Sequence, residues 1–244
     1  MFILKYWYRA FRYRFRNDRF EIAFIRSQVQ KGQVCVDIGA HKGGYLYWLQ
    51  AAVGKTGKVY AFEPQPILYD YLQKGKQKMA WQHVFIDNRA ISSEKGNVDL
   101  YIPQHGSNTS PGATLRGEKM GKDLPFFTVK VETLTLDDFF ADKNLLPDFL
   151  KIDVEGNEMK VFEGATGLLS QKKPILLFEC EQRHLGETPI ETVFAFLQQY
   201  GYEGYFICQN ELKPISEFSL SKHQKQGKGK FWEAEGYCNN FVFR

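Results

Sequence analysis

The stretch VCVDIGAHKG at residues 34–43 and the stretch VYAFEP at residues 59–64 decide the fold of this chain. Each is an apolar run of strand length. The first ends in an acidic residue and a glycine turn, and the second ends in a lone glutamate, Glu63. Glycine lets the backbone approach a ligand closely, and an acid after the second strand of a parallel sheet can accept hydrogen bonds from ribose hydroxyls. The two stretches therefore predict a nucleoside cofactor at the carboxyl edge of a parallel sheet.

The rest of the chain alternates between strand-like and helix-like segments, which predicts an α/β fold with a doubly wound parallel sheet. We expect strands at 34–38, 59–63, 83–87, 149–154, 174–179, 203–208 and 241–243, and helices at 44–53, 66–79, 157–170 and 189–200. Two stretches interrupt this alternation. Residues 96–131 contain two strand-like runs around a loop, as an inserted hairpin would, and residues 209–236 are polar and form an expected variable segment.

The length of 244 residues suits one large domain with an appendage, so we expect a helical arm at 1–31 and a single domain at 32–244. No run reaches the roughly 18 apolar residues of a membrane-spanning helix, and the start of the chain lacks the apolar core of a signal peptide. The four cysteines lie far apart beside apolar runs. We therefore expect buried free thiols and a cytoplasmic location.

The positive charge is concentrated in the first residues of the chain. Of the net charge of +4, residues 1–19 carry +5, from six basic side chains and one acidic one, so residues 20–244 carry −1. The body is therefore not basic, and no nucleic-acid partner is expected for it.

Residues 4–19 are predicted to form a helix, followed by a second helix up to Gln30. Two stripes run side by side along the first helix: Leu4, Tyr8, Phe11 and Phe15, then Lys5, Arg9, Arg12, Arg16 and Arg19. Three interpretations are open. The arm contacts an anionic membrane surface, it packs its aromatic stripe on the body or on a second subunit, or it contacts nucleic acid.

The spacing of the glycines separates two kinds of cofactor. A nicotinamide-binding loop requires glycine at the position of His41, whereas the pattern Asp-x-Gly-x-x-x-Gly favours S-adenosylmethionine. The segment after the third strand is expected to contact the adenine. The predicted cofactor-binding residues are Asp37, Gly39, Ala40, His41, Gly43, Glu63, Pro64, Asp87 and Asn88.

Two later strands also end in acidic residues, in the stretches KIDVEGNE at 151–158 and FECEQRH at 178–184. Asp153 is the first candidate for the base that takes the acceptor's proton, and the other catalytic candidates are Glu155, Glu181 and His184. Glu155 has a plainer interpretation as a helix cap. A divalent cation such as Mg²⁺, held by Asp153 and Glu179, is a further prediction.

At these motifs the chain resembles the FkbM family of S-adenosylmethionine-dependent methyltransferases. The resemblance rests on Asp37 to Gly43, Phe62-Glu63-Pro64, Thr135 to Asp138 and Lys151 to Gly156, within residues 32–185. It implies a class I methyltransferase fold, with seven strands of which the last is antiparallel, and transfer mostly to hydroxyl oxygens of sugars and secondary metabolites. Many family members carry asparagine where this chain has His41.

From the motifs and the resemblance together we expect an O-methyltransferase that acts on a hydroxyl of a sugar, a glycolipid or a secondary metabolite. The partner would be a small-molecule or glycan acceptor. Two other interpretations stay open: a non-catalytic module that keeps the fold for partner or membrane binding, and a dehydrogenase. Homo-oligomerisation and peripheral membrane contact through residues 4–19 are also open.

Overall fold

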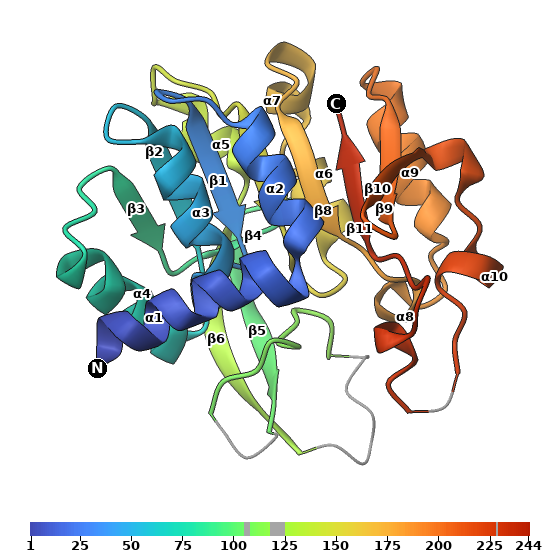
Figure 1. Cartoon of the computed structure of the whole chain (residues 1–244), viewed down its shortest axis with the longest axis horizontal. Coiled ribbons are helices and arrows are strands. Elements are labelled where there is room, and N and C mark those ends of the chain that lie inside the picture. Colours follow the sequence, from blue (N-terminus) through green and yellow to red (C-terminus); the bar gives the residue numbers. More distant parts are fainter. Residues whose placement is uncertain (105–107, 118–124, 228) are drawn as a thin grey trace.

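The computed structural model describes residues 1–104, 108–117, 125–227 and 229–244. Its centre is an eight-stranded sheet of order β10-β9-β11-β8-β7-β1-β2-β3 (Figure 1). The strands are β1 (Val34–Ile38), β2 (Lys58–Phe62), β3 (Val84–Asp87), β7 (Phe149–Ile152), β8 (Ile175–Glu179), β9 (Gly204–Cys208), β10 (Glu211–Pro214) and β11 (Asn240–Phe243).

The pairing within this sheet confirms the predicted α/β fold. β1 lies between β2 and β7 and is parallel to both, whereas β11 runs antiparallel between β8 and β9. The seven expected strands form, and the last one is antiparallel, as the family resemblance implies. β10 adds an eighth strand at the edge, antiparallel to β9. It follows a tight turn at Gln209 and Asn210, both with positive φ, inside the segment that we expected to be variable.

Helices cover both faces of the sheet because successive side chains of each strand point to opposite sides. Val36 and Ile38 of β1 belong to one apolar core, and Cys35 belongs to the other. The first face is covered by α5 (Leu136–Ala141), α6 (Glu158–Glu163), α7 (Thr166–Gln171) and α9 (Ile190–Gln199). The second is covered by α1 (Phe2–Arg12), α2 (Arg19–Gln28), α3 (Gly44–Val53) and α4 (Pro66–Lys78).

The helix expected at 157–170 is two helices, α6 and α7, because the chain breaks at Gly164. A Cβ on Gly164 would overlap the Ser92 carbonyl oxygen, so the backbone passes there without a side chain. The carboxylate of Asp137 accepts hydrogen bonds from the amides of Gly167 and Leu168, at 2.8 and 2.9 Å, and so caps α7. The Thr135 to Asp138 motif therefore has a structural role, since Thr135 caps α5 as well.

Residues between β3 and α5 form a second, three-stranded sheet. Its strands are β4 (Ala90–Ile91), β5 (Gly96–Pro103) and β6 (Phe126–Leu134), with β5 and β6 paired antiparallel. The hairpin lies beyond the carboxyl edge of the main sheet (Figure 1). The loop between β5 and β6 is described only at residues 104, 108–117 and 125, so residues 105–107 and 118–124 of the predicted insertion lie outside the described part.

The N-terminal arm packs through a different face from the one that its stripes suggest. We expected one helix at 4–19. Its α-helical part, α1, ends at Arg12, and a π-helical turn follows at Tyr13–Asn17. Tyr6 and Ala10 are buried, whereas Leu4 and Tyr8 are 66% and 70% exposed. Of the predicted aromatic stripe, only the Phe11 ring is seen to contact the body among the described residues, 5.5 Å from that of Trp48, so the stripe is not the main packing face, and its packing on a second subunit stays a prediction. The Tyr6 ring instead lies parallel to that of Tyr71, with the centroids 5.9 Å apart.

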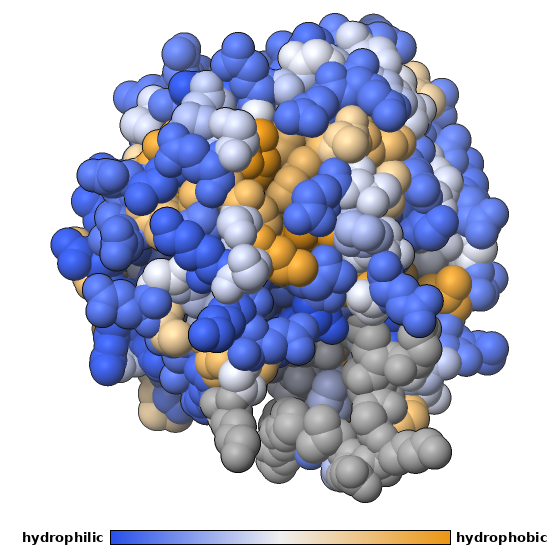
Figure 2. All heavy atoms as spheres, turned by 90° about the vertical axis from the view of Figure 1, so that its right-hand side faces the viewer, coloured by the Kyte–Doolittle hydropathy of each residue, from blue (hydrophilic) through white to orange (hydrophobic). Residues whose placement is uncertain are grey.

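The remaining short elements follow β8, in the C-terminal part of the chain. They are α8 (Gln182–Leu185), η3 (Ile215–Glu217), α10 (Leu220–His223) and η4 (Phe231–Glu233). The surface on the β10 side is mostly hydrophilic, with a hydrophobic area near its middle (Figure 2).

All four cysteines are buried and free, as expected. No helix in the described part of the chain has the length and apolarity needed to cross a membrane.

Gly43→Ala tests how the arm is seated on the body. A Cβ on Gly43 would overlap the Tyr6 hydroxyl oxygen, and Gly43 has φ of +74°. We expect the free energy of unfolding to fall by about 2 kcal/mol or more, measured by urea denaturation. Gly32→Ala is the matched control. It has φ of +87° but its nearest atom would be 3.8 Å away, so it should lose only about 1 kcal/mol. Equal losses in the two variants would contradict the account.

Candidate active site

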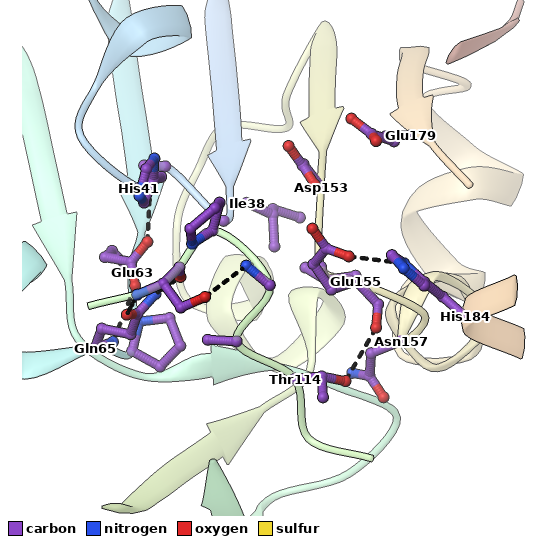
Figure 3. A pocket seen from close by; sticks show the side chains of 18 of the residues that line it. Ile38, His41, Glu63, Gln65, Thr114, Asp153, Glu155, Asn157, Glu179 and His184 are labelled. Atoms are coloured by element: carbon purple, nitrogen blue, oxygen red, sulfur yellow. Dashed lines mark hydrogen bonds and ion pairs between the residues drawn. The ribbon is translucent and has the colours of Figure 1, made fainter. Parts of the chain in front are cut away.

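A cavity of about 510 Å³ opens at the carboxyl ends of β1, β2, β7 and β8 (Figure 3). This edge is where parallel α/β sheets bind ligands, and the volume is that of a small-molecule site. The sequence-predicted residues that line it are Asp37, Gly39, Ala40, His41, Glu63, Pro64, Asp153, Glu155, Glu179, Glu181 and His184. The cavity thus brings together residues from four strand ends.

The turn after β1 is shaped by Gly39. It has φ of +80°, and a Cβ there would overlap the carbonyl oxygen of Asp153 at the end of β7. The amides of Gly39 and Ala40 both donate to the Phe62 carbonyl, at 3.0 Å. His41 follows with φ of +47°, a conformation that histidine and asparagine adopt more readily than most residues. The backbone of β1 is therefore held directly against the ends of β2 and β7.

Glu63 is fixed at the end of β2 by backbone donors. Its side chain accepts hydrogen bonds from the amides of His41, at 2.7 Å, and Gln65, at 2.9 Å. Burial raises the pKa of this carboxyl to about 7. Each carboxylate oxygen can accept more than one hydrogen bond, so Glu63 retains acceptor capacity toward the cavity that it lines.

Two buried polar atoms beside this turn have no hydrogen-bond partner among the described residues: Oδ2 of Asp37 and Nε2 of His41. Burial raises the pKa of Asp37 to about 7 and lowers that of His41 to about 4. Buried polar groups are nearly always hydrogen-bonded in folded proteins. Both residues line the cavity, but these two atoms have almost no exposed surface, so a ligand would reach them only if neighbouring groups moved.

A buried lysine lies among the carboxylates at the ends of β7 and β8. The Nζ atom of Lys151 is 3.8 Å from Oδ2 of Asp153, and its side chain is only 2% exposed. Burial raises the pKa of Asp153 to about 6 and holds that of Glu179 well above its usual range. Asn239 donates a 2.7 Å hydrogen bond to Glu179. Asp153 keeps 36% of its side chain exposed, so it is accessible from the cavity.

Glu155 and His184 form a pair on the opposite wall (Figure 3). Oε2 of Glu155 lies 2.7 Å from Nδ1 of His184, and the hydroxyl of Thr114 donates to the Glu155 carbonyl at 3.0 Å. Glu155 has φ of +53°. The side chain of Glu155 thus orients His184. The carboxylate that accepts a hydrogen bond from the backbone amide of Gly156, just before α6, belongs to Glu158 and not to Glu155.

Glu181 is held by its neighbours. Arg183 donates two hydrogen bonds to it, each of 2.7 Å, and the hydroxyl of Tyr237 donates a third. Burial alone would raise the pKa of Glu181, but these hydrogen bonds lower it below its ordinary value. The guanidinium also lies 4.4 Å from the ring centroid of Trp232. This geometry favours an anchoring role for Glu181 over the predicted role in proton transfer.

Three of the predicted cofactor residues do not line the cavity: Gly43, Asp87 and Asn88. The space beside Gly43 is filled by Tyr6. Asp87 is bound to Arg89 through hydrogen bonds of 2.6 and 2.9 Å.

The cavity also has walls that the motifs did not indicate, from the arm, the insertion and the C-terminal segment. These lining residues include Tyr13, Asn17, Asp18, Ser110, Thr114, Trp232 and Asn239; Gln65 and Arg183 line the cavity from beside the motifs themselves. The residues in the arm, the insertion and the C-terminal segment meet the cavity only through long-range contacts, for which the sequence has no local signal.

The predicted metal ligands do not form a compact donor set. Among the described residues, no group of three or more histidine, cysteine, aspartate or glutamate side chains could hold a metal ion. The ammonium group of Lys151 already lies beside Asp153. Asp153 and Glu179 therefore do not fit a divalent cation by themselves.

The order of the main sheet, with its antiparallel β11, is that of the class I methyltransferase fold. The model of the methyltransferase FkbM domain matches residues 37–203, and the chain belongs to this family. The predicted resemblance is thus confirmed, and the dehydrogenase interpretation has no support. A curated relative, the hexuronic acid methyltransferase AglP of Haloferax volcanii, is 21% identical over 176 residues. The alignment covers 71% of this chain and 65% of that protein, slightly less than two thirds of its length.

Two solved structures share the fold at low sequence identity. The FkbM methyltransferase of Methylobacillus flagellatus KT has a TM-score of 0.55 and 13% identity, over 91% of this chain and 50% of that one. Aeropyrum pernix fibrillarin, in complex with natively bound S-adenosyl-L-methionine, has a TM-score of 0.50 and 10% identity, over 92% of this chain and 73% of that one.

Gln65→Leu tests how the insertion closes the cavity. The side chain of Gln65 accepts from the amide of Ser110, at 3.1 Å, and donates to the Ser110 carbonyl, at 3.0 Å. Losing both bonds should cost about 1.4 kcal/mol and speed hydrogen exchange of the Ser110 amide about tenfold. Gln73→Leu is the control, because the Gln73 amide bonds only to Tyr69 on the same helix. Unchanged exchange in Gln65→Leu would contradict this closure.

Proposed function

We propose that this protein is an S-adenosylmethionine-dependent O-methyltransferase whose acceptor is a hydroxyl of a sugar, a glycolipid or a secondary metabolite. The observation that carries the proposal is the division of one cavity into two walls. A glycine turn with Glu63 and Asp37 lies at the ends of β1 and β2, and Asp153, Glu155 and His184 lie at the ends of β7 and β8.

The residues of the first wall fit S-adenosylmethionine, which supplies a methyl group already activated on a sulfonium. Glu63, fixed by two backbone amides, retains acceptor capacity for the two ribose hydroxyls. Asp37, which lies behind the glycine turn and lines the cavity, adds a second acidic side chain on the side where the cofactor's ammonium group would lie. The described lining includes seven acidic side chains but only two from lysine and arginine, Lys151 and Arg183, and this imbalance suits a positively charged ligand, whose charge would favour the ionised form of the acids.

Asp153 is the residue we propose as general base. Its backbone touches Gly39 in the cofactor turn, and its partly exposed carboxylate faces the cavity. The carboxylate would take the proton of the acceptor hydroxyl while the oxygen–methyl bond forms and the sulfur–methyl bond breaks. Lys151, 3.8 Å away, keeps Asp153 ionised to lower pH than burial alone would allow. The rest of the catalysis is alignment of the acceptor.

The second wall has the groups that a polyhydroxylated acceptor needs. His184, oriented by Glu155, offers a ring nitrogen for a hydroxyl, and Trp232 adds an aromatic ring that is 37% exposed. The name of the AglP relative, a hexuronic acid methyltransferase, supports a sugar acceptor.

Glu63→Gln tests the cofactor half. Replacing the charged acceptor should weaken binding of S-adenosylhomocysteine by about 1.5–3 kcal/mol, which is roughly 10- to 150-fold, in calorimetric titration. Asp87→Asn is the control, because Asp87 lies outside the cavity and should leave affinity unchanged. If only Asp87→Asn weakened the binding of S-adenosylhomocysteine, Asp87 and not Glu63 would be the acid that binds the cofactor.

Asp153→Asn tests the base. Transfer of labelled methyl groups to hexuronic acid glycosides should slow by about 10²–10⁴-fold, while binding of S-adenosylhomocysteine is retained. Because burial raises the pKa of Asp153 to about 6, the wild-type rate at saturating S-adenosylmethionine, where Glu63 and Asp37 are held by the cofactor, should fall as the pH drops below about 6 and the base becomes protonated. This acid limb should be absent from the residual activity of the variant. Full activity of Asp153→Asn would exclude the role, and cofactor binding by the wild-type chain without transfer to any hydroxylated acceptor would favour the non-catalytic module.

A further inference from the structure

We propose that the outward face of α1 docks this protein on an anionic lipid surface. The inference concerns a surface outside the cavity and does not depend on the proposed reaction. It rests on three observations about the arm: the helix is packed on the body through its inner face, its outer apolar side chains are between 43% and 70% exposed, and cationic side chains flank them.

The arm is held firmly from below, so its outer face has a fixed composition. The buried Tyr6 ring lies between those of Tyr71 and Trp81, with centroids 5.9 and 5.7 Å away. The indole nitrogen of Trp48 donates a 2.8 Å hydrogen bond to the carbonyl of Ala10, and Arg9 donates one of the same length to the Tyr71 hydroxyl. The exposed face is therefore the reverse side of a helix that is packed on α3 and α4.

A row of large apolar side chains lies on that reverse side, and we call it the α1 strip. Helical spacing places its members on one face. In a monomeric soluble protein, neighbouring exposed aromatic residues mark an interaction surface. The strip consists of Leu4, Trp7, Tyr8 and Phe11 on α1 and Phe15 on the π-helical turn that continues it, which are 66%, 44%, 70%, 43% and 61% exposed. The Phe11 ring also contacts that of Trp48 on α3, with the centroids 5.5 Å apart.

Cationic side chains flank the strip along its length. Lys5, Arg12 and Arg16 are exposed, and residues 1–17 contain no acidic side chain at all. The positive surface continues onto the neighbouring α4, where Nζ of Lys74 lies 5.5 Å from the ring centroid of Phe2 on α1. An apolar row beside a cationic row on one helix is the pattern of a helix that lies in the plane of a membrane interface, with its rings among the headgroups.

The same charges make two other occupants of the strip less suitable. A symmetric dimer through this face would place the arm's cations against their own copies, because a two-fold interface pairs a surface with itself. Nucleic acid is less suitable because its phosphates would face the apolar row, which includes Leu4. The body adds no attraction, since residues 20–244 carry a net charge of −1. A lipid surface satisfies both rows together.

The arm also reaches the cavity. The π-helical turn that continues α1 contributes Tyr13 and Asn17 to the lining, and Asp18 follows directly. One continuous segment thus contains both the α1 strip and part of the cavity wall. A protein docked through the strip would have its cavity wall close to the headgroups, where a lipid-linked acceptor is accessible.

Vesicle flotation of the full chain tests the proposal. With phosphatidylcholine vesicles that contain about one third phosphatidylserine, we expect binding at least tenfold stronger than with phosphatidylcholine alone, and weaker binding at high salt. The double variant Trp7→Ser/Phe11→Ser and the triple variant Lys5→Gln/Arg12→Gln/Arg16→Gln should each reduce binding at least tenfold. Phe85→Ser, at a ring that is 40% exposed on β3, is the control and should leave binding unchanged.

Three results would overturn the proposal. The first is an intact chain that does not float with anionic vesicles, and the second is flotation that neither arm variant reduces. The third is a different occupant: light scattering that shows a dimer which Trp7→Ser/Phe11→Ser converts to a monomer, or binding of an RNA oligonucleotide, in either case without vesicle binding. Circular dichroism and S-adenosylhomocysteine titration of the variants distinguish loss of docking from loss of the fold or of the cofactor site.

Discussion

The contact between Gly39 and the Asp153 carbonyl is the constraint on which the site depends. It is possible only because Gly39 has no side chain and has φ of +80°. The contact holds the end of β1 against the end of β7, while the amides of Gly39 and Ala40 tie the same turn to β2. Three strand ends thus meet at one point. The cofactor turn and the proposed base are therefore placed by backbone geometry and do not rely on flexible side chains.

The cavity around this point concentrates acidic side chains, and burying them carries a cost to the fold. Asp37, Glu63 and Asp153 all have raised pKa values, and burial is the main cause in each case. Lys151, itself buried, offsets only part of this cost. Such an arrangement suits a site for a cationic ligand and a proton acceptor better than it suits stability. By contrast, the hydrogen bonds that Arg183 and Tyr237 donate to Glu181 lower the pKa of Glu181.

The sequence predicted the central sheet because its strands are continuous apolar runs that end in glycine or acidic residues. It also predicted the set of carboxylates at the rim, since parallel strand ends share one edge. It could not predict that the Tyr6 side chain fills the space beside Gly43, where we expected the cofactor, or that Arg89 binds Asp87. The stripe on α1 was recognised, but periodicity alone does not tell which face of a helix packs. The face with Tyr6 and Ala10 packs on the body because the space beside two glycines, Gly43 and Gly75, accommodates the Tyr6 ring.

The most direct test of the central claim is a crystal structure of the chain with S-adenosylhomocysteine. The account predicts that the ligand lies in the cavity at the ends of β1 and β2, with both ribose hydroxyls on the Glu63 carboxylate and the sulfur directed toward Asp153. A ligand bound elsewhere, or a ribose that makes no contact with Glu63, would contradict it.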